Sequence, residues 1–447
     1  MNPEDEQKTP PPVAGREPEP PQGGEIRARW AWVEASVWSA RMLQALETGL
    51  EGNKWFRLID KVWSEENLQR ALVRVVENGG SAGIDGRSVK VVKEAGEEEV
   101  SILHRQLRAD SYRPAPVKRV WIDKPGSAEK RPLGVPTVRD RIVQTALRHV
   151  IEPIFERDFA PQSYGFRPGR GCKDALRRVE QLLREGRVWV VDADLKSYFD
   201  TIPHRALLKR VSEKIADGRV LKLIESYLKA GVMESVKEWK PSEGGTPQGA
   251  VMSPLLANIY LDPLDWEMAR AGAPMVRYAD DFVVLCQSEE EARAALDQIQ
   301  GFAQANGLTL HPEKTRIVDA SQKGGFDFLG YHFERGMKWP RPKSLEKFKE
   351  KVREKTRRTE GRSLKAICAD LNRTLKGWFE YFKHSKQTTF GNLDGYVRGR
   401  LRSILRKRAG GEGRGRGRDH QRWPNAYFHA HGLLSLSEQH RAARQSP

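Results

Sequence analysis

The sequence has few cysteines and no long apolar run. Its 447 residues include only three cysteines, Cys172, Cys286 and Cys368, and no two of them form a Cys-x-x-Cys pair. This spacing argues against a disulfide framework and a cysteine-rich zinc site, and it indicates a reducing, intracellular setting. No apolar run reaches the roughly 18 to 20 residues of a membrane span, and the first 25 residues are acidic and proline-rich, unlike a signal peptide. We therefore expect a cytoplasmic protein with no membrane partner.

Positive charge is balanced by acidic residues through most of the chain and in excess only at its end. Residues 1–334 carry 48 basic and 50 acidic side chains, whereas residues 335–447 carry 29 and 10. Aromatic residues interleave this basic block. Such a block predicts a polyanionic partner, because each phosphate that Lys or Arg neutralises releases counterions.

Local patterns predict a mixed α and β chain. Residues 1–24 hold seven prolines and almost no large apolar residue, so we expect them to be disordered. Apolar spacing predicts helices over residues 27–95 and 139–155, with a strand pair between them at 117–122 and 131–135. Three further helices are expected toward the end of the chain, over residues 344–360, 364–382 and 393–407.

Three aspartates stand at the ends of short apolar β segments. Asp194 follows a Trp-Val-Val run, and Asp280 and Asp281 form a tight turn between two further segments. If the strands pair, these carboxylates come together, and unpaired anions repel strongly in a low dielectric. Carboxylate oxygens without His or Cys companions favour Mg²⁺, and two such ions about 3.5 to 4 Å apart suit an in-line phosphoryl displacement. A solvated Asp-Asp turn is the alternative for an isolated pair.

Seven segments in chain order carry a resemblance to a known family. They are KRPLGVPTVRD (130–140), SYGFRPGR (163–170), ADLKSYFD (193–200), GTPQGAVMSP (245–254), YADD (278–281), NRTLKGWFEYF (372–382) and RWPNAYF (422–428). Through these segments the sequence resembles bacterial group II intron-encoded reverse transcriptase/maturases, over residues 53 to 436. Four residues such as YADD are weak evidence alone, but the ordered set is specific.

The resemblance implies an α+β fold of the right-hand polymerase type, with fingers, a palm built on an antiparallel sheet, a helical thumb and a basic C-terminal segment. The expected divisions are a disordered N-terminus over 1–24, an N-terminal extension and fingers over 25–190, a palm over 191–335, a thumb of maturase helices over 336–409, and a basic tail over 410–447. Because that tail lacks paired cysteines, we expect no HNH endonuclease module in it.

The resemblance also implies roles for individual residues. Asp194, Asp280 and Asp281 would be catalytic and hold two Mg²⁺ ions, for which Mn²⁺ can substitute, with the backbone carbonyl of Leu195 as a further ligand. The expected nucleotide-binding residues are Lys124, Arg131, Phe199, Gln248 and Lys314. For Phe199 the alternative is plain core packing, and for the lysines it is a solvated surface position.

The basic segment is expected to grip nucleic acid. Its candidate contacts are Lys347, Lys351, Lys355 and Arg358 on one face of the charged helix, and Arg398, Arg402 and Arg406 on the last helix. The implied partners are group II intron RNA, an RNA template with a DNA primer, target DNA and dNTPs, with a homodimer as an open possibility. The implied location is the bacterial cytoplasm, in association with the nucleoid.

The implied function is RNA-directed DNA polymerase activity, together with binding of the parent intron RNA for splicing and retrohoming. Two alternatives stay open at this point. One is a host-recruited reverse transcriptase in defence or repair. The other is an RNA-binding splicing factor with a vestigial polymerase, against which the intact set of three aspartates argues.

Overall fold

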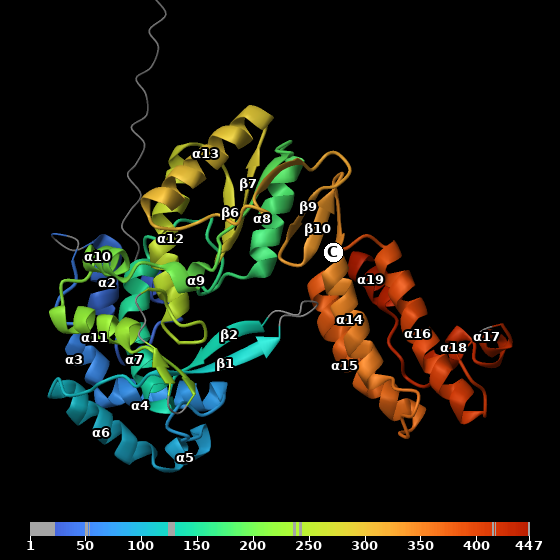
Figure 1. Cartoon of the computed structure of the whole chain (residues 1–447), viewed down its shortest axis with the longest axis horizontal. Coiled ribbons are helices and arrows are strands. Elements are labelled where there is room, and N and C mark those ends of the chain that lie inside the picture. Colours follow the sequence, from blue (N-terminus) through green and yellow to red (C-terminus); the bar gives the residue numbers. More distant parts are fainter. Residues whose placement is uncertain are drawn as a thin grey trace, which may run out of the picture.

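The computed structural model describes residues 23–49, 52, 54–123, 130–235, 238–240, 244–413, 415 and 417–445. The first 22 residues of the segment expected to be disordered lie outside the described residues, and so does Lys124. Figure 1 shows a group of helices at the N-terminal end, a sheet flanked by helices in the middle, and a separate column of helices at the C-terminal end.

The N-terminal part is a helical layer packed around one long helix, α7 (Val138–Glu156), which is buried along most of its length. The surrounding helices are α1 (Gly23–Arg29), α2 (Ala40–Thr48), α3 (Ile59–Trp63), α4 (Glu65–Asn78), α5 (Val89–Glu94) and α6 (Gly96–Arg108). Serine or threonine side chains accept a hydrogen bond at the N-termini of α2, α4, α5 and α7, which satisfies backbone N–H groups left free there. The helical character predicted up to residue 95 continues through α6.

The expected strand pair projects from this layer. Strand β1 (Val117–Asp123) runs antiparallel to β2 (Lys130–Val135), and β4 (Val232–Ser235) and β5 (Glu238–Lys240) extend the sheet in the order β2-β1-β4-β5. In Figure 1, β1 and β2 lie between the N-terminal helices and the C-terminal helical column. In a right hand, this sheet corresponds to part of the fingers.

A second, antiparallel sheet forms the centre of the molecule, in the order β6-β7-β3-β8. Its strands are β3 (Trp189–Asp194), β6 (Met275–Tyr278), β7 (Asp281–Cys286) and β8 (Arg316–Asp319). Successive side chains point to opposite faces, so each face builds its own core. One face packs with α12 (Ser253–Arg270) and α13 (Glu289–Ala305), and the other packs with α8 (Cys172–Arg184). Three short helices follow β3 at its edge: α9 (Tyr198–Thr201), α10 (His204–Ser212) and α11 (Gly218–Lys229).

A small three-stranded sheet joins the palm to the thumb. It consists of β9 (Phe326–Phe328), β10 (Tyr331–Glu334) and β11 (Met337–Pro340). The chain then enters α14 (Pro342–Lys355), α15 (Leu364–Phe382) and α16 (Thr388–Arg408). Helix α15 therefore begins and ends at the residues predicted from the amphipathic stripe over 364–382. In contrast, α14 ends at Lys355 rather than Glu360, and α16 begins five residues before the predicted Leu393.

The last residues do not form a separate tail. Helices α17 (Arg418–Arg422), α18 (Asn425–Ala430) and α19 (Leu436–Gln445) fold back, and Trp423, Phe428 and Leu436 enter the same core as α15 and α16. The division expected at 409/410 thus cuts through one packed unit. Helices together with largely antiparallel sheets, in which β1 and β4 form a parallel pair, make an α+β right-hand polymerase fold. No helix in the described part of the chain has the length and apolarity needed to cross a membrane.

Candidate active site

The three predicted aspartates converge at one end of the palm sheet. Strands β3 and β7 pair so that Asp194 lies directly opposite Asp281. Asp280 occupies the turn between β6 and β7, next to Ala279, whose φ of 61° makes the turn tight. Because strand residues two apart share a face, Asp192 lies on the same face as Asp194. The fold therefore brings together Asp194 and Asp280, which are 86 positions apart in the sequence.

A buried arginine holds this turn in place. Arg277 is 1% exposed and donates from Nη2 to Asp265 Oδ2 at 2.5 Å and from Nη1 to the Ala279 carbonyl at 2.8 Å. A third bond runs from Nη1 to Asn258 Oδ1 at 2.9 Å. Sequence reasoning missed these residues. The signal that could have found them is a lone Arg inside an apolar strand, with an Asp inside the largely apolar helix α12.

Gly165 packs against the turn between β6 and β7, and the turn can lie this close only because Gly165 has no side chain. A Cβ atom at this position would lie 2.3 Å from the Ala279 backbone nitrogen, which no side chain permits. The next residue, Phe166, is 48% exposed, and its ring centroid lies 6.2 Å from that of Tyr278. The segment 163–170 thus serves as a support for the turn that carries Asp280 and Asp281.

Burial and neighbouring charges raise the pKa of three carboxyl groups in the cluster. Burial, followed by the charges of Asp192, Asp280 and Asp194, raises the pKa of Asp281 to about 7. Burial also raises the pKa of Asp192 to about 6 and that of Asp280 above its ordinary value. Each shift means that the anionic form is disfavoured until a positive charge arrives.

Two cations reach the cluster from the segment that leads into β8. Lys314 Nζ lies 2.5 Å from Asp194 Oδ2, and Arg316 Nε lies 3.3 Å from Asp192 Oδ2. The His311 N–H donates to the Asp194 carbonyl at 2.7 Å, which fixes this segment beside β3. Lys314, predicted to contact the nucleotide, therefore sits directly on a predicted metal ligand.

The donor set has the chemistry that a hard divalent cation prefers. Its members are carboxylates at one edge of the sheet, and burial raises the pKa of Asp280 and Asp281, so a bound cation would stabilise their anionic forms. Among the described residues, no three Asp, Glu, His or Cys side chains are spaced closely enough to enclose one metal ion. Leu195, whose carbonyl was expected to contribute, is 4% exposed and pairs with Leu310 across a short bridge.

Predicted nucleotide-binding residues from two distant segments contact each other near this edge. Arg131 Nε on β2 donates to Gln248 Oε1 at 2.7 Å. A Cβ atom at Gly249 would lie 2.7 Å from the Gly134 carbonyl, so only glycine allows the two segments to approach this closely. Phe199 is 7% exposed and part of the main core, and its carbonyl accepts the Thr246 N–H at 2.6 Å.

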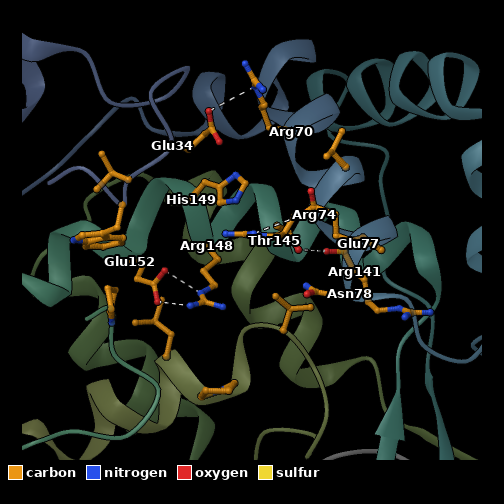
Figure 2. A pocket seen from close by; sticks show the side chains of 18 of the residues that line it. Glu34, Arg70, Arg74, Glu77, Asn78, Arg141, Thr145, Arg148, His149 and Glu152 are labelled. Carbon is orange, nitrogen blue, oxygen red and sulfur yellow. Dashed lines mark hydrogen bonds and ion pairs between the residues drawn. The ribbon is translucent and has the colours of Figure 1, made fainter. Parts of the chain in front are cut away.

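A groove of about 620 Å³ leads toward this region from the N-terminal helices. Figure 2 shows its walls, in which Arg148 on α7 faces Glu152 and Arg70 on α4 faces Glu34. Burial lowers the pKa of His149 in the same wall to about 4, so its imidazole is neutral. The groove also reaches Phe166 and the segment 251–255 that follows Gln248 and Gly249.

The basic residues expected to touch nucleic acid divide into two groups. Lys347 and Lys351 are exposed on α14, Arg358 is exposed beyond its end, and Arg398 is half-buried on α16. The expectation that Arg358 shares a helix face with the lysines is wrong, because α14 stops at Lys355.

The second group, Lys355, Arg402 and Arg406, forms hydrogen bonds and ion pairs within the thumb. The expectation for Arg402 is wrong: it is 3% exposed and donates to the Trp423 carbonyl and to Asn425 Oδ1, both at 2.9 Å. Arg406 pairs with Asp419 at 2.5 Å, and Lys355 pairs with Asp370 at 2.6 Å. These three side chains join helices of the thumb.

Comparison with protein families gives two matches in chain order. Residues 122–333 match the model described as reverse transcriptase (RNA-dependent DNA polymerase), and residues 345–423 match the group II intron, maturase-specific domain. The first match contains the carboxylate cluster, and the second contains the thumb helices α15 and α16.

The chain is also similar to individual proteins. Protein YkfC of Escherichia coli is 34% identical over 322 residues, which cover 62% of this chain and 83% of YkfC. The group II intron-encoded protein LtrA of Lactococcus lactis is 42% identical over 169 residues, which cover 38% of this chain and 28% of LtrA. Among solved structures, a chain of a partial Cas6-RT-Cas1–Cas2 complex is 23% identical over 57% of this chain and 44% of that chain, with a TM-score of 0.36.

Proposed function

This chain belongs to the reverse transcriptases that carry a group II intron maturase domain, and from that premise we propose that it copies RNA into DNA at the carboxylate cluster of the palm. The observation that carries the proposal is the register of β3 and β7, which sets Asp194 opposite Asp281, with Asp280 in the adjoining turn. Three carboxylates in this geometry, two of which have a pKa raised chiefly by burial, are suited to holding cations at a phosphoryl-transfer centre.

Reverse transcriptases generally use divalent metal ions, and the ion that we propose here is Mg²⁺, held by Asp194, Asp280 and Asp281 with the Leu195 carbonyl. Bound there, the metal would lower the pKa of the primer 3′-hydroxyl and stabilise negative charge on the phosphates. Lys314, which pairs with Asp194 in this structure, would donate a proton to the departing pyrophosphate. Its side chain is 60% exposed, which supports this role.

The nucleotide lies, in this proposal, between the fingers strand β2 and the palm. Arg131 exchanges its contact with Gln248 for the triphosphate, and the Gln248 amide supports the base pair. Gly249 lets the backbone of this segment lie against β2, so the floor of the site is narrow. In this proposal the ring of Phe199 would exclude a 2′-hydroxyl, which would give preference for dNTPs over NTPs.

We further propose that the groove of Figure 2 receives the single-stranded template. Arginines on α4 and α7 line it, and Trp32 and Phe166, which are 38% and 48% exposed, offer ring faces on which bases can stack. The exposed cations of the thumb, Lys347 and Lys351, would track the phosphates of the product duplex or of the parent intron RNA. Splicing and retrohoming of that RNA remain part of the proposal.

The test is primer extension on an RNA template with Mg²⁺ and dNTPs. The variants Asp280→Asn and Asp281→Asn should each lose at least about 100-fold in rate, because a metal ligand contributes several kcal/mol at the transition state. Asp297→Asn, at an exposed position on α13, is the matched control and should extend primers like the wild type. A folded wild type that binds RNA but makes no DNA on several templates would favour the splicing factor with a vestigial polymerase.

A further inference from the structure

A second cavity lies at the junction of palm and thumb, and none of the catalytic aspartates lines it. It has a volume of about 520 Å³. Its walls come from α8, the turn between β10 and β11, the loop between α15 and α16, and α19. Figure 1 shows α19 near β10, and residues of both line the cavity. We call this cavity the junction pocket.

Cationic side chains enter the junction pocket from each of these elements. They are Arg184, Lys338, Lys383, Lys386 and Arg444. Glu180 is the single acidic side chain in the lining that the structure describes; it pairs with Lys338 and lies 3.9 Å from Arg184. Just outside the lining, Glu380 lies 3.1 Å from Lys383. Positive charge is therefore in excess inside a concave surface, where solvent screens it less than on a flat face.

Burial shifts the pKa of two groups within the pocket, and the excess charge adds to the shift of one of them. Burial lowers the pKa of Lys338 to about 8. Burial and the neighbouring charges of Lys338 and Lys383 lower the pKa of His384, and Arg177 and Lys173 on α8 add to the effect. An anion bound here would relieve this repulsion among the cations.

The pocket is built on a fixed frame. The Lys386 N–H donates to the Lys338 carbonyl at 3.0 Å, which ties the thumb loop to β11. Tyr331 donates to the Tyr381 carbonyl at 2.6 Å, and Tyr381 donates to the Leu329 carbonyl at 2.7 Å. Lys386 also lies 3.8 Å from the centre of the Trp339 ring, which holds its ammonium at the pocket. Cations held in place lose less freedom when they bind a ligand.

We propose that the junction pocket is a binding site for the phosphate backbone of folded RNA, separate from the site that holds primer and template. An RNA ligand is favoured because the pocket adds to the basic block of residues 335–447, and because Lys383 and Lys386 lie within the part of the chain that matches the maturase-specific domain. That this RNA is the parent intron rests on the function proposed above. RNA bound here would span palm and thumb, and so would fix their relative position during synthesis.

The experiment measures binding of a fluorescent RNA hairpin to the full chain while an unlabelled primer–template duplex saturates the polymerase site. The variant replaces Lys383, Lys386 and Arg444 by Gln and leaves the buried Lys338 in place. The matched control removes the same charge on the far side of the palm, with Arg205, Lys209 and Lys222, which are exposed on α10 and α11, replaced by Gln.

We expect the junction variant to bind the hairpin at least about tenfold more weakly at low salt, and its slope of log affinity against log salt to fall by up to about 2.7 for three lost phosphate contacts. Primer extension and thermal stability should match the wild type, and the control should keep the wild-type slope. Equal slopes for variant and wild type would overturn the proposal, as would displacement of the hairpin by a polyglutamate peptide at equal charge. If the triple variant does not fold, Lys386→Gln with Lys386→Arg as rescue replaces it. If the wild type extends no primer yet binds the hairpin through this pocket, the polymerase proposal fails and the RNA site stands.

Discussion

Replacing Asp265 by Asn removes one charge from an ion pair in which both side chains are buried, at 1% and 0% exposure. Breaking such a pair leaves the Arg277 guanidinium charged without a counterion, at a cost of about 3 to 5 kcal/mol. In a unit of this size each kcal/mol shifts the melting temperature by about 2 to 4 °C. We therefore expect the variant to melt about 6 to 20 °C below the wild type in a thermal unfolding experiment.

The same substitution should also affect activity, because Arg277 holds the Ala279 carbonyl at 2.8 Å and so fixes the turn that carries two catalytic aspartates. A displacement of about 1 Å at a reacting centre can cost about 100-fold in rate. Asp110→Asn is the matched control, since it breaks a 2.6 Å ion pair with Lys222 that is exposed on both sides. Solvent screens an exposed ion pair strongly, so the control should keep both stability and rate.

A double variant separates the two effects. Arg277→Met with Asp265→Leu replaces the charges by apolar groups of similar size, which should return most of the lost stability. It cannot return the hydrogen bond to Ala279, so primer extension should stay slow. If Asp265→Asn melts and extends primers like the Asp110→Asn control, the reasoning that this buried pair positions the turn is wrong.

The pKa of Asp281 is raised to about 7 in the folded chain and is near 4 in the unfolded chain, so the folded chain binds the proton more tightly between these pH values. The metal-free protein should therefore lose stability as pH rises from about 4 to about 7, and thermal melts should show a smaller loss in Asp281→Asn. Gly165→Ala should slow primer extension at least about tenfold, because its Cβ would meet the turn at 2.3 Å, whereas Gly301→Ala on α13, with open space around it, should raise stability slightly and leave the rate unchanged. Arg402→Ala should lower the unfolding free energy by about 2 to 3 kcal/mol through two lost buried hydrogen bonds. Lys351→Ala should weaken RNA binding in a salt titration without changing stability. If Arg402→Ala instead weakened RNA binding alone and Lys351→Ala lowered stability alone, the assignment of Arg402 to the core and of Lys351 to the RNA-binding surface would be wrong.

The sequence alone could name the three catalytic aspartates but could not specify which residues contact them. Asp194, Asp280 and Asp281 each stand in a segment whose local pattern is strong, so the residues could be named before their distances were known. Their common edge followed once β3 and β7 were paired, since pairing register fixes which residues are opposite. The contact of Lys314 with Asp194 joins residues 120 positions apart, and no local pattern specifies it.

Short-range chemistry determined much of the fold from the sequence itself. The stripe of apolar residues and the N-cap serine at position 363 defined α15 to the residue, because periodicity and capping depend on neighbours three or four positions away. The strand pair β1 and β2 followed from two β segments around a turn for the same reason. Charge composition likewise placed the excess of basic residues in the last quarter of the chain.

Tertiary packing decided what those local rules leave open. Basic residues look alike in the sequence, but Arg402 is buried among α16, Trp423 and Asn425 while Lys351 faces solvent, because the folding back of the last helices covers one and not the other. Helix α14 ends where Arg400 donates to the Thr356 carbonyl at 2.7 Å, a contact made across 44 residues. Long-range contacts of this kind depend on which surfaces meet after the chain has closed its loops, and that information becomes available only in the folded structure.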